Sequence, residues 1–318
     1  MNSNIKIEFL HDKDIKSFFL FINGNWKKNY IFTKDKNFFN WQFYNSKKKI
    51  YNFIIAKKNK KIVGCLGFIS NNSYSKIFKK KNYLWLVNWF VVDKYKNLSL
   101  KLIQFLIKKK NYHFIGTIGC TNKTQKILKA LKFHTGTLIH VVCQNDLKKK
   151  FYLSKFKKKN SKIFIKKKIK IKKINRFEIK SFFKFLKPIN LKNEEYFFKR
   201  YFNHPNYKYI SYGLYENNTH LGFFICRECK YKNYKSLKII DYHGSKLNLS
   251  SFFSNFKKIL SANNYEFVDF YFYSKENFFN YKNYILKKNI KIKFAFQTYD
   301  KFFNPLFVRG DCDQDRPN

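Results

Sequence analysis

The fold is decided by the stretch from Trp85 to Leu100, which reads WLVNWFVVDKYKNLSL. The apolar run from Trp85 to Val92 predicts a strong strand. From Leu98 to Lys110 the apolar side chains recur at a spacing that predicts a buried helix. We therefore expect a strand, a tight loop and a helix N-terminus in direct succession. Such a turn can hold a pyrophosphate without metal, because loop N–H groups converge there and the helix dipole adds partial positive charge. A generic strand-to-helix turn is the alternative.

The rest of the first half surrounds this unit with alternating strands and helices. Strands are predicted at 5–10, 51–56, 62–69, 112–120 and 137–143, and helices at 11–22 and 123–131. A lysine-rich run from 146 to 173 has little apolar periodicity at its start and indicates a boundary.

The order of elements then partly repeats. Helices are predicted at 177–186, 249–262 and 276–287, and strands at 207–215, 221–227, 237–242 and 267–273. The sequence therefore predicts an α/β (mixed-sheet) protein with two tandem halves, 1–150 and 174–318, joined by a basic linker region at 151–173. The second half ends in an acidic C-terminal tail.

The chain is strongly basic, and this charge has either a functional or a mutational origin. The 318 residues include 67 Lys and Arg against 19 Asp and Glu, a formal net charge of +48, which is typical of chains that bind nucleic acid or anionic membranes. Only five of the 67 are Arg, the residue that specific nucleic-acid sites favour. Lys, Asn, Ile, Phe and Tyr are enriched together, as an AT-rich genome produces. We attribute the charge to mutational drift and expect no specific nucleic-acid partner. Polyanion binding and a membrane-surface role are the alternatives.

Location and metal content follow from what the chain lacks. No stretch approaches the ~20 apolar residues of a membrane span, and the N-terminal residues do not form a secretory signal. Cys226 and Cys229 form a CxxC with no second pair and no nearby His, so Cys226 is expected to be a strand thiol. We expect a reduced cytoplasmic protein with no metal or redox cofactor.

The loop after the strand resembles the acyl-CoA site of the GNAT superfamily. Val92-Asp93, Tyr95 and Lys96 match its motif, and Asn97 and Ser99 stand where small glycines usually lie. The resemblance implies two tandem GNAT-like halves, the first of which binds acyl-CoA (acetyl-CoA or a short acyl-CoA) as co-substrate. A backbone N–H of the preceding strand would polarise the thioester carbonyl. The implied binding residues are Trp89, Phe90, Val91, Val92, Lys96, Asn97, Leu98, Ser99 and Leu100.

A helix downstream also resembles the superfamily, with one departure. Thr121–Phe133 matches the helix that often carries the tyrosine proton donor for the leaving thiolate, but Leu128 stands at that position. The resemblance then implies that the proton comes from another group or from water.

The second half carries a sharper resemblance. The segments 199–209, 239–244 and 310–318 and Arg227 are similar to two-domain GNAT-type N-acyltransferases encoded with bacterial surface-polysaccharide genes, as are 40–42 and 51–53 in the first half. This implies transfer of an acyl group from acyl-CoA to the amine of a nucleotide-linked amino sugar. The implied acceptor contacts are Arg200, Tyr201, Arg227, Asp313, Asp315 and Arg316.

His204 and Asp241 are the candidates for catalysis, because an ammonium must lose its proton before it attacks a thioester. A turn position for His204, a structural salt bridge for Asp241, buried ion pairs for Arg200 and Arg227, and a structural clasp for the tail are the alternatives. Two other functions also stay open. One is a Fem-type transferase that uses aminoacyl-tRNA, and the other is a non-catalytic basic module that binds RNA or a membrane surface.

Overall fold

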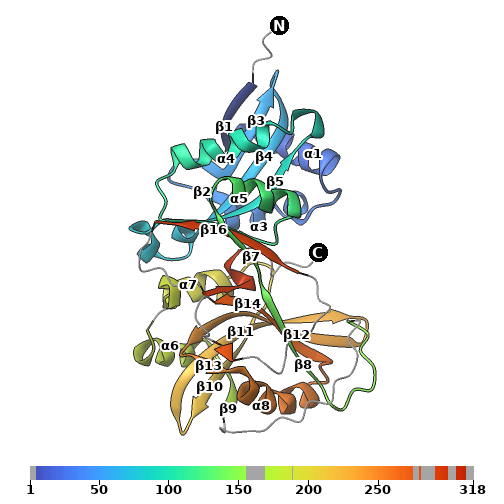
Figure 1. Ribbon diagram of the computed structural model, residues 1–318, viewed down its shortest axis with the longest axis vertical. Helices are drawn as coiled ribbons and strands as arrows, with labels where there is room; N and C mark the ends of the chain where they lie inside the picture. The colour runs from blue at the N-terminus through green and yellow to red at the C-terminus, as the bar shows by residue number, and fades with distance from the viewer. Residues whose placement is uncertain are drawn as a thin grey trace. The chain divides into compact units, whose positions relative to one another are not determined.

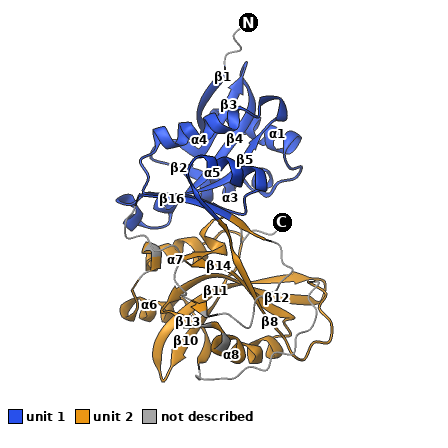
Figure 2. Ribbon diagram, in the orientation of Figure 1, with its two compact units in different colours: residues 1–135, 294–301 blue, residues 136–293, 302–318 orange. Residues whose placement is uncertain are grey.

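The computed structural model describes residues 5–154, 169–187, 189–274, 279–280, 291–299 and 306–312 (Figure 1). The chain forms two compact units, residues 1–135 with 294–301 and residues 136–293 with 302–318 (Figure 2). Each unit contains a large sheet with both parallel and antiparallel strands, together with helices. The predicted fold class, a mixed-sheet α/β protein with two tandem halves, is confirmed.

The sheet of the first unit has the strand order β1-β3-β4-β5-β6-β16-β7, with β2 paired to β3. Its strands are β1 Ile5–His11, β2 Tyr44–Asn45, β3 Ile50–Lys58, β4 Lys61–Ser70, β5 Tyr83–Val91, β6 Phe114–Ile118, β7 His134–Thr137 and β16 Lys293–Thr298. Its helices are α1 Ile15–Asn25, α2 Ile31–Lys34, α3 Lys36–Phe43, α4 Leu98–Lys109 and α5 Asn122–Ala130. Strand β5 runs parallel to β6 and antiparallel to β4.

Helices cover both faces of this sheet. Adjacent residues of a strand point to opposite faces, and β3 shows the two layers. Ile54 belongs to the apolar cluster that includes Leu102 of α4 and Leu128 of α5. Phe53 packs instead against Phe18 of α1, at 4.9 Å between ring centroids, and against rings of α3. The layer under α4 and α5 is therefore mainly aliphatic, with a few rings such as Phe68 and Phe133, and phenylalanine rings dominate the layer under α1 and α3.

The sheet of the second unit has the order β17-β14-β12-β11-β10-β9, with β8 also paired to β14. Its strands are β8 Ile139–Gln144, β9 Lys170–Ile174, β10 Ile210–Glu216, β11 Thr219–Tyr231, β12 Tyr234–Gly244, β14 Phe267–Ser274 and β17 Leu306–Val308. The helices are α6 Arg176–Phe185, α7 Glu194–Phe197 and α8 Leu249–Ala262. A π-helical turn spans Phe198–Phe202, 3-10 turns span Ile189–Leu191 and Arg309–Asp311, and β13 Leu247–Asn248 pairs with β15 Phe279–Asn280.

Two strands lie in a different unit from the one that the element order predicts. Strand β8, predicted as the end of the first half, pairs with β14 in the second sheet. Strand β16, from far along the chain, completes the first sheet by pairing with β6. The chain therefore passes from one unit to the other at 135/136, 293/294 and 301/302, whereas the sequence predicted that the first half ends at residue 150. The reason is that apolar strands of similar length can pair with several partners, and long-range packing selects among them.

Other predictions need smaller corrections. The helix predicted at 276–287 lies largely outside the described residues, which include only 279–280, part of β15, in that range. Helix α3 was not predicted at all. Cys226 lies fully buried within β11, which confirms it as a strand thiol. Within the ranges that the structure describes, no helix is both long enough and apolar enough to cross a membrane.

Candidate active site

In the first unit, strand β5 loses its parallel neighbour partway along its length. It pairs with β6 over three residue pairs, from Tyr83↔Phe114 to Trp85↔Gly116, and no further pair between them occurs in the described part of the chain. On its other edge, β5 stays paired with β4 as far as Val91. Beyond Trp85, the edge of β5 that faces β6 is therefore not covered by a neighbouring strand in the described part of the chain. An extended ligand can add to such an edge by hydrogen bonding to its backbone.

A β-bulge sits where the two strands part. The register between β4 and β5 shifts between Cys65 and Gly67, so that β5 carries one extra residue. Asn88 takes up the bulge with φ of 51°, in the left-handed region that asparagine tolerates. Its carbonyl accepts a hydrogen bond from the Cys65 thiol at 3.5 Å, and its side-chain oxygen accepts one from the Tyr30 hydroxyl at 3.0 Å.

The bulge also sets the direction of the side chains that follow. Trp89 and Val91 pack against the cluster under α4. Phe90 points to the other face, where its ring stacks on Trp26 at 5.9 Å with an interplanar angle of 7°. The end of β5 thus presents one set of side chains to the α4 face and another to the α1 face.

The loop from Val92 to Asn97 is compact and built from backbone hydrogen bonds. The amide of Val92 donates to the Val63 carbonyl at 3.0 Å, and the amides of Tyr95 and Lys96 close a 3-10 turn. Asn97 has φ of −63° and ψ of −22°, an ordinary helical conformation. The asparagine at this position therefore meets no steric obstacle, although glycine was the expected residue.

At the start of helix α4, Asn97 and Leu100 are exposed, whereas Leu98 is buried. The Ser99 amide donates to the Lys96 carbonyl at 3.1 Å. The remaining amides of the first turn have no acceptor within the helix and lie at the positive end of its dipole. Lys96 is exposed, and Ser99 is half-buried beside it. The strand, tight loop and helix N-terminus predicted from 85–100 thus occur in direct succession.

Helix α5 follows β6 and offers no proton donor at Leu128. This side chain is fully buried in the apolar cluster under α4 and α5. The helix begins at Asn122 because the Thr121 hydroxyl caps it by accepting from the Thr124 amide at 3.2 Å. Leu128 is a core residue, so a proton for a leaving group has to come from elsewhere.

These features match a known architecture. The fold is similar to that of GCN5-related N-acetyltransferases. The similar solved structures include such an enzyme from Anabaena variabilis ATCC 29413, with a TM-score of 0.58 at 9% identity, covering 93% of this chain and 73% of that one. They also include Saccharomyces cerevisiae N-myristoyltransferase with bound myristoyl-CoA, with a TM-score of 0.50 at 12% identity, covering 94% and 79%.

A third similar structure is the GCN5-related glucosamine N-acetyltransferase region of a fungal multi-domain GH3 beta-N-acetylglucosaminidase. Its TM-score is 0.55 at 10% identity, and the match covers 93% of this chain and 38% of that one. No family model and no curated protein matches the sequence. At these identities the likeness to GCN5-related enzymes is a likeness of fold.

In the second unit, strands β12 and β14 resemble the pair β5 and β6, but a third strand covers the edge at which they separate. Strands β12 and β14 are parallel over three residue pairs, from Leu237↔Val268 to Ile239↔Phe270. Phe272 of β14 then pairs with Ile139 of β8 on one edge and with Val308 of β17 on the other, so β17 takes the edge that β12 has left. The turn after β17 packs against β12. A Cβ on Gly310 would lie 2.7 Å from Cγ2 of Ile240.

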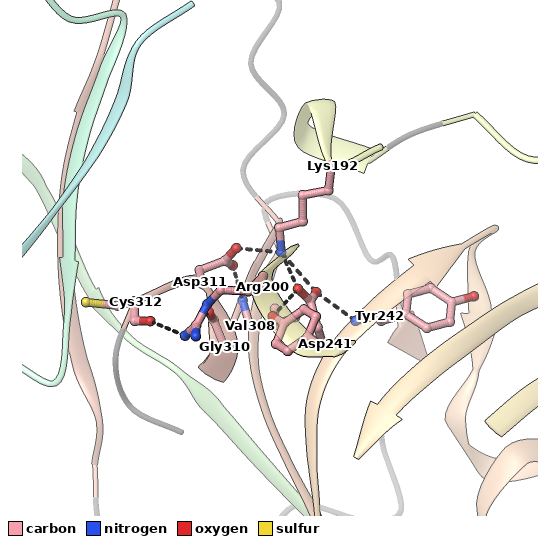
Figure 3. A network of polar contacts seen from close by, with 9 residues as sticks. Lys192, Arg200, Asp241, Tyr242, Val308, Gly310, Asp311 and Cys312 are labelled. Carbon is pink, nitrogen blue, oxygen red and sulfur yellow. Dashed lines mark hydrogen bonds and ion pairs between the residues drawn. The ribbon is translucent and has the colours of Figure 1, made fainter. Parts of the chain in front are cut away.

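A buried polar network fixes this turn (Figure 3). Asp241 is fully buried and accepts from Lys192 at 2.9 and 3.0 Å and from the Tyr201 hydroxyl at 2.6 Å. Lys192 also contacts Asp311 at 2.5 Å, and Arg200 donates to the carbonyls of Gly310 at 3.4 Å and Cys312 at 3.0 Å. Two carboxylates thus share one lysine, away from water. Burial raises the pKa of Asp311 to about 6; Lys192 opposes the rise and Asp241 adds to it.

Several of the predicted site residues lie in this network. Arg200, Tyr201 and Asp241 are brought together, but their exposed fractions are 2%, 1% and 0%. A group held in this way serves the structure, which favours the structural alternatives for Asp241 and Arg200. Lys192 was missed by sequence reasoning, because nothing in a chain so rich in lysine distinguishes it before its burial is known.

His204 and Arg227 meet at a different residue, Tyr207. The His204 ring stacks on Tyr207 at 4.6 Å, and the Arg227 guanidinium lies 4.7 Å from the centre of the same ring. Nδ1 of His204 accepts from the backbone amides of Asn206 and Tyr207, at 3.1 and 3.0 Å, and so closes a turn. This favours the turn alternative for His204. Asp313, Asp315 and Arg316 lie outside the described residues.

Proposed function

We propose that this protein is an acyl-CoA-dependent N-acyltransferase whose donor site lies in the first unit. The observation that carries the proposal is the free edge of β5 at the Asn88 bulge, directly before the exposed start of α4. Pantetheine would pair with the backbone of Trp89–Val91. The pyrophosphate would lie against Val92, Lys96 and the first turn of α4, with Asn97, Leu98, Ser99 and Leu100.

The chemistry needs no covalent acyl-enzyme. The neutral amine attacks the thioester carbonyl, the new C–N bond forms, and the tetrahedral intermediate collapses with loss of the C–S bond. The amine's proton is released and the thiolate takes up a proton, so amide and free CoA thiol are the products. A backbone N–H near the bulge would stabilise the oxyanion, since charge develops on that oxygen in the transition state. Because Leu128 is apolar and buried, water is the proposed proton donor.

The proposed acceptor is the amine of a nucleotide-linked amino sugar. Two things support it: the resemblance of the segments 199–209, 239–244 and 310–318 to enzymes of this class, and the likeness in fold to a glucosamine N-acetyltransferase region. Asp313, Asp315 and Arg316 stay as proposed acceptor contacts. Arg200, Tyr201, Asp241 and His204 are assigned to the structure of the second unit instead, because they are buried within it.

Isothermal titration with CoA tests the donor site. We expect wild-type protein to bind CoA with a dissociation constant no weaker than high micromolar, and Ser99→Glu to weaken binding at least tenfold. A carboxylate at Ser99 would face the pyrophosphate at close range, where like charges repel by one to several kcal/mol. Ser17→Glu is the matched control, because Ser17 is exposed on α1 and adds the same charge elsewhere. Equal CoA binding by both variants would place the donor site elsewhere.

A further inference from the structure

A small apolar cavity lies beside the bulge, on the face of the sheet covered by α1 and α3. Its volume is about 10 Å³, roughly the space for the centre of one water molecule, and it is lined by Phe18, Phe19, Ile22, Trp26, Tyr30, Phe32, Thr33, Phe39, Phe53 and Asn88. Aromatic rings dominate this lining, and none of these ten side chains is charged. Asn88, the residue of the bulge, forms part of its wall.

Next to this cavity an aromatic wall, Trp26, Tyr30 and Phe90, reaches the surface. Trp26 is 37% exposed and lies parallel to Phe90, while its ring centroid is 5.4 Å from that of Tyr30. Large exposed rings cost free energy in water, so a surface tryptophan stacked beside a reactive strand is a candidate contact for a ligand.

The side chains of β5 separate this wall from the donor loop. Trp89 and Val91 pack under α4, whose start forms the proposed phosphate site. Asn88 and Phe90 face Tyr30 and Trp26. A thioester held at the bulge from the α4 side would have the aromatic wall on its other side.

We propose that this wall binds the acceptor, with a sugar ring lying against Trp26 and its amine directed to the thioester at Asn88. The inference rests on the proposed function and adds the place and chemistry of acceptor binding. A pyranose presents a flat C–H face that packs on an aromatic ring, and its hydroxyls need hydrogen-bond partners. The Asn88 side chain supplies one: its oxygen accepts from Tyr30, and its NH2 group has no partner in the described residues.

Charge decides which amines fit. The cavity lining contains no carboxylate to attract a polyamine or a lysine side chain. Lys27 lies 5.8 Å from the centre of the Tyr30 ring, and the whole chain carries a net charge of +48. This field repels cationic acceptors and attracts acceptors that carry phosphate. An amino sugar linked to a phosphate or nucleotide has the matching ring and charge.

The test compares Trp26→Ala with Trp26→Phe, which keeps a ring. Tyr231→Ala is the control, since Tyr231 is an exposed ring (64%) on β11 in the other unit. For each full-length protein, acetyl-CoA affinity is measured by titration, and steady-state transfer is measured with UDP-glucosamine. Phosphoethanolamine serves as an amine with phosphate but no ring, and spermidine as a polycation.

We expect Trp26→Ala to raise KM for UDP-glucosamine at least tenfold, with acetyl-CoA affinity unchanged within twofold. Trp26→Phe should recover most of the loss, and Tyr231→Ala should match wild type. Phosphoethanolamine and spermidine should be poorer substrates than UDP-glucosamine. An unchanged KM in Trp26→Ala, or better transfer to spermidine, overturns the inference. The inference is also overturned if the wild-type protein binds CoA but this complex does not bind UDP-glucosamine. If the wild-type protein does not bind CoA at all, the proposed function itself is wrong.

Discussion

Asp311 makes the stability of the second unit depend on pH in an unusual direction. Its carboxyl is buried with Lys192 and Asp241, and burial raises its pKa from 3.8 to about 6. Between about pH 4 and pH 6 the folded protein therefore keeps a proton that the unfolded chain releases. Stability contributed by this group is present below the unfolded pKa and is lost as pH rises through the folded pKa. At 1.36 kcal/mol per pKa unit, the loss across this window is about 3 kcal/mol.

The perturbation that isolates this effect is Asp311→Asn. The amide cannot ionise, so the stability of the variant does not fall with rising pH for this reason. It also gives up part of the contacts to Lys192 and the Val308 amide, a cost of about 1–3 kcal/mol that does not vary with pH. Urea unfolding of wild type and variant between pH 4.5 and 7.5 gives the difference in unfolding free energy. Groups common to both proteins cancel in that difference.

We expect the difference to move by about 2 kcal/mol in favour of the variant as pH rises from 4.5 to 7.5, because part of the window below pH 6 lies under pH 4.5. Asp146→Asn is the control. Asp146 pairs with Lys257 near the surface, with 55% of its side chain exposed, and exposed ion pairs add little to stability, so Asp146→Asn should change the unfolding free energy little. A difference for Asp311→Asn that does not change with pH would show that Asp311 is ionised in the fold throughout, and the argument from burial would then be wrong.

Three further outcomes follow from the described geometry. Asn88→Val should lower the unfolding free energy by about 1–3 kcal/mol and weaken CoA binding, because a β-branched residue resists φ of 51°. Asn88→Gly should keep the wild-type stability and CoA affinity. If both variants unfold at the same urea concentration, the bulge is not strained. Deleting 313–318 should leave melting temperature and CoA affinity nearly unchanged and reduce transfer to UDP-glucosamine, and normal transfer would remove those residues from the acceptor site. Binding to generic RNA should be weak and fall steeply with salt if the charge of +48 is drift, and a tight complex that survives physiological salt would favour the tRNA-dependent alternative.

Local patterns in the sequence determined much of the architecture. Apolar runs placed the strands around 51–69, 85–92, 114–118 and 267–273, and helical periodicity placed α4 and α8. The succession of strand, loop and helix from Trp85 to Leu100 follows from these patterns alone, since hydrophobic periodicity and backbone propensity act over a few residues. So does the placement of Cys226 in a strand.

The tertiary structure decided which strands meet. Strand β8 pairs with β14 over a separation of more than 120 residues, and β16 pairs with β6 over more than 170. The sequence of an apolar strand of five or six residues does not determine which strand it pairs with, because the packing of whole sheets selects the partner. The same holds for the bulge at Asn88. Its position depends on the register against β4, which the sequence of β5 does not contain.

The tertiary structure also decided which charged residues can act. The sequence singled out Arg200 as one of five arginines and Asp241 as a candidate proton acceptor, and the structure places both in one buried network with Lys192 and Asp311. Trp26 and Tyr30 drew no attention among 4 Trp and 23 Tyr, yet they lie beside the bulge. Residue type records which chemistry a side chain can perform. Burial and neighbours, set by contacts far apart in the chain, determine whether a ligand can reach it.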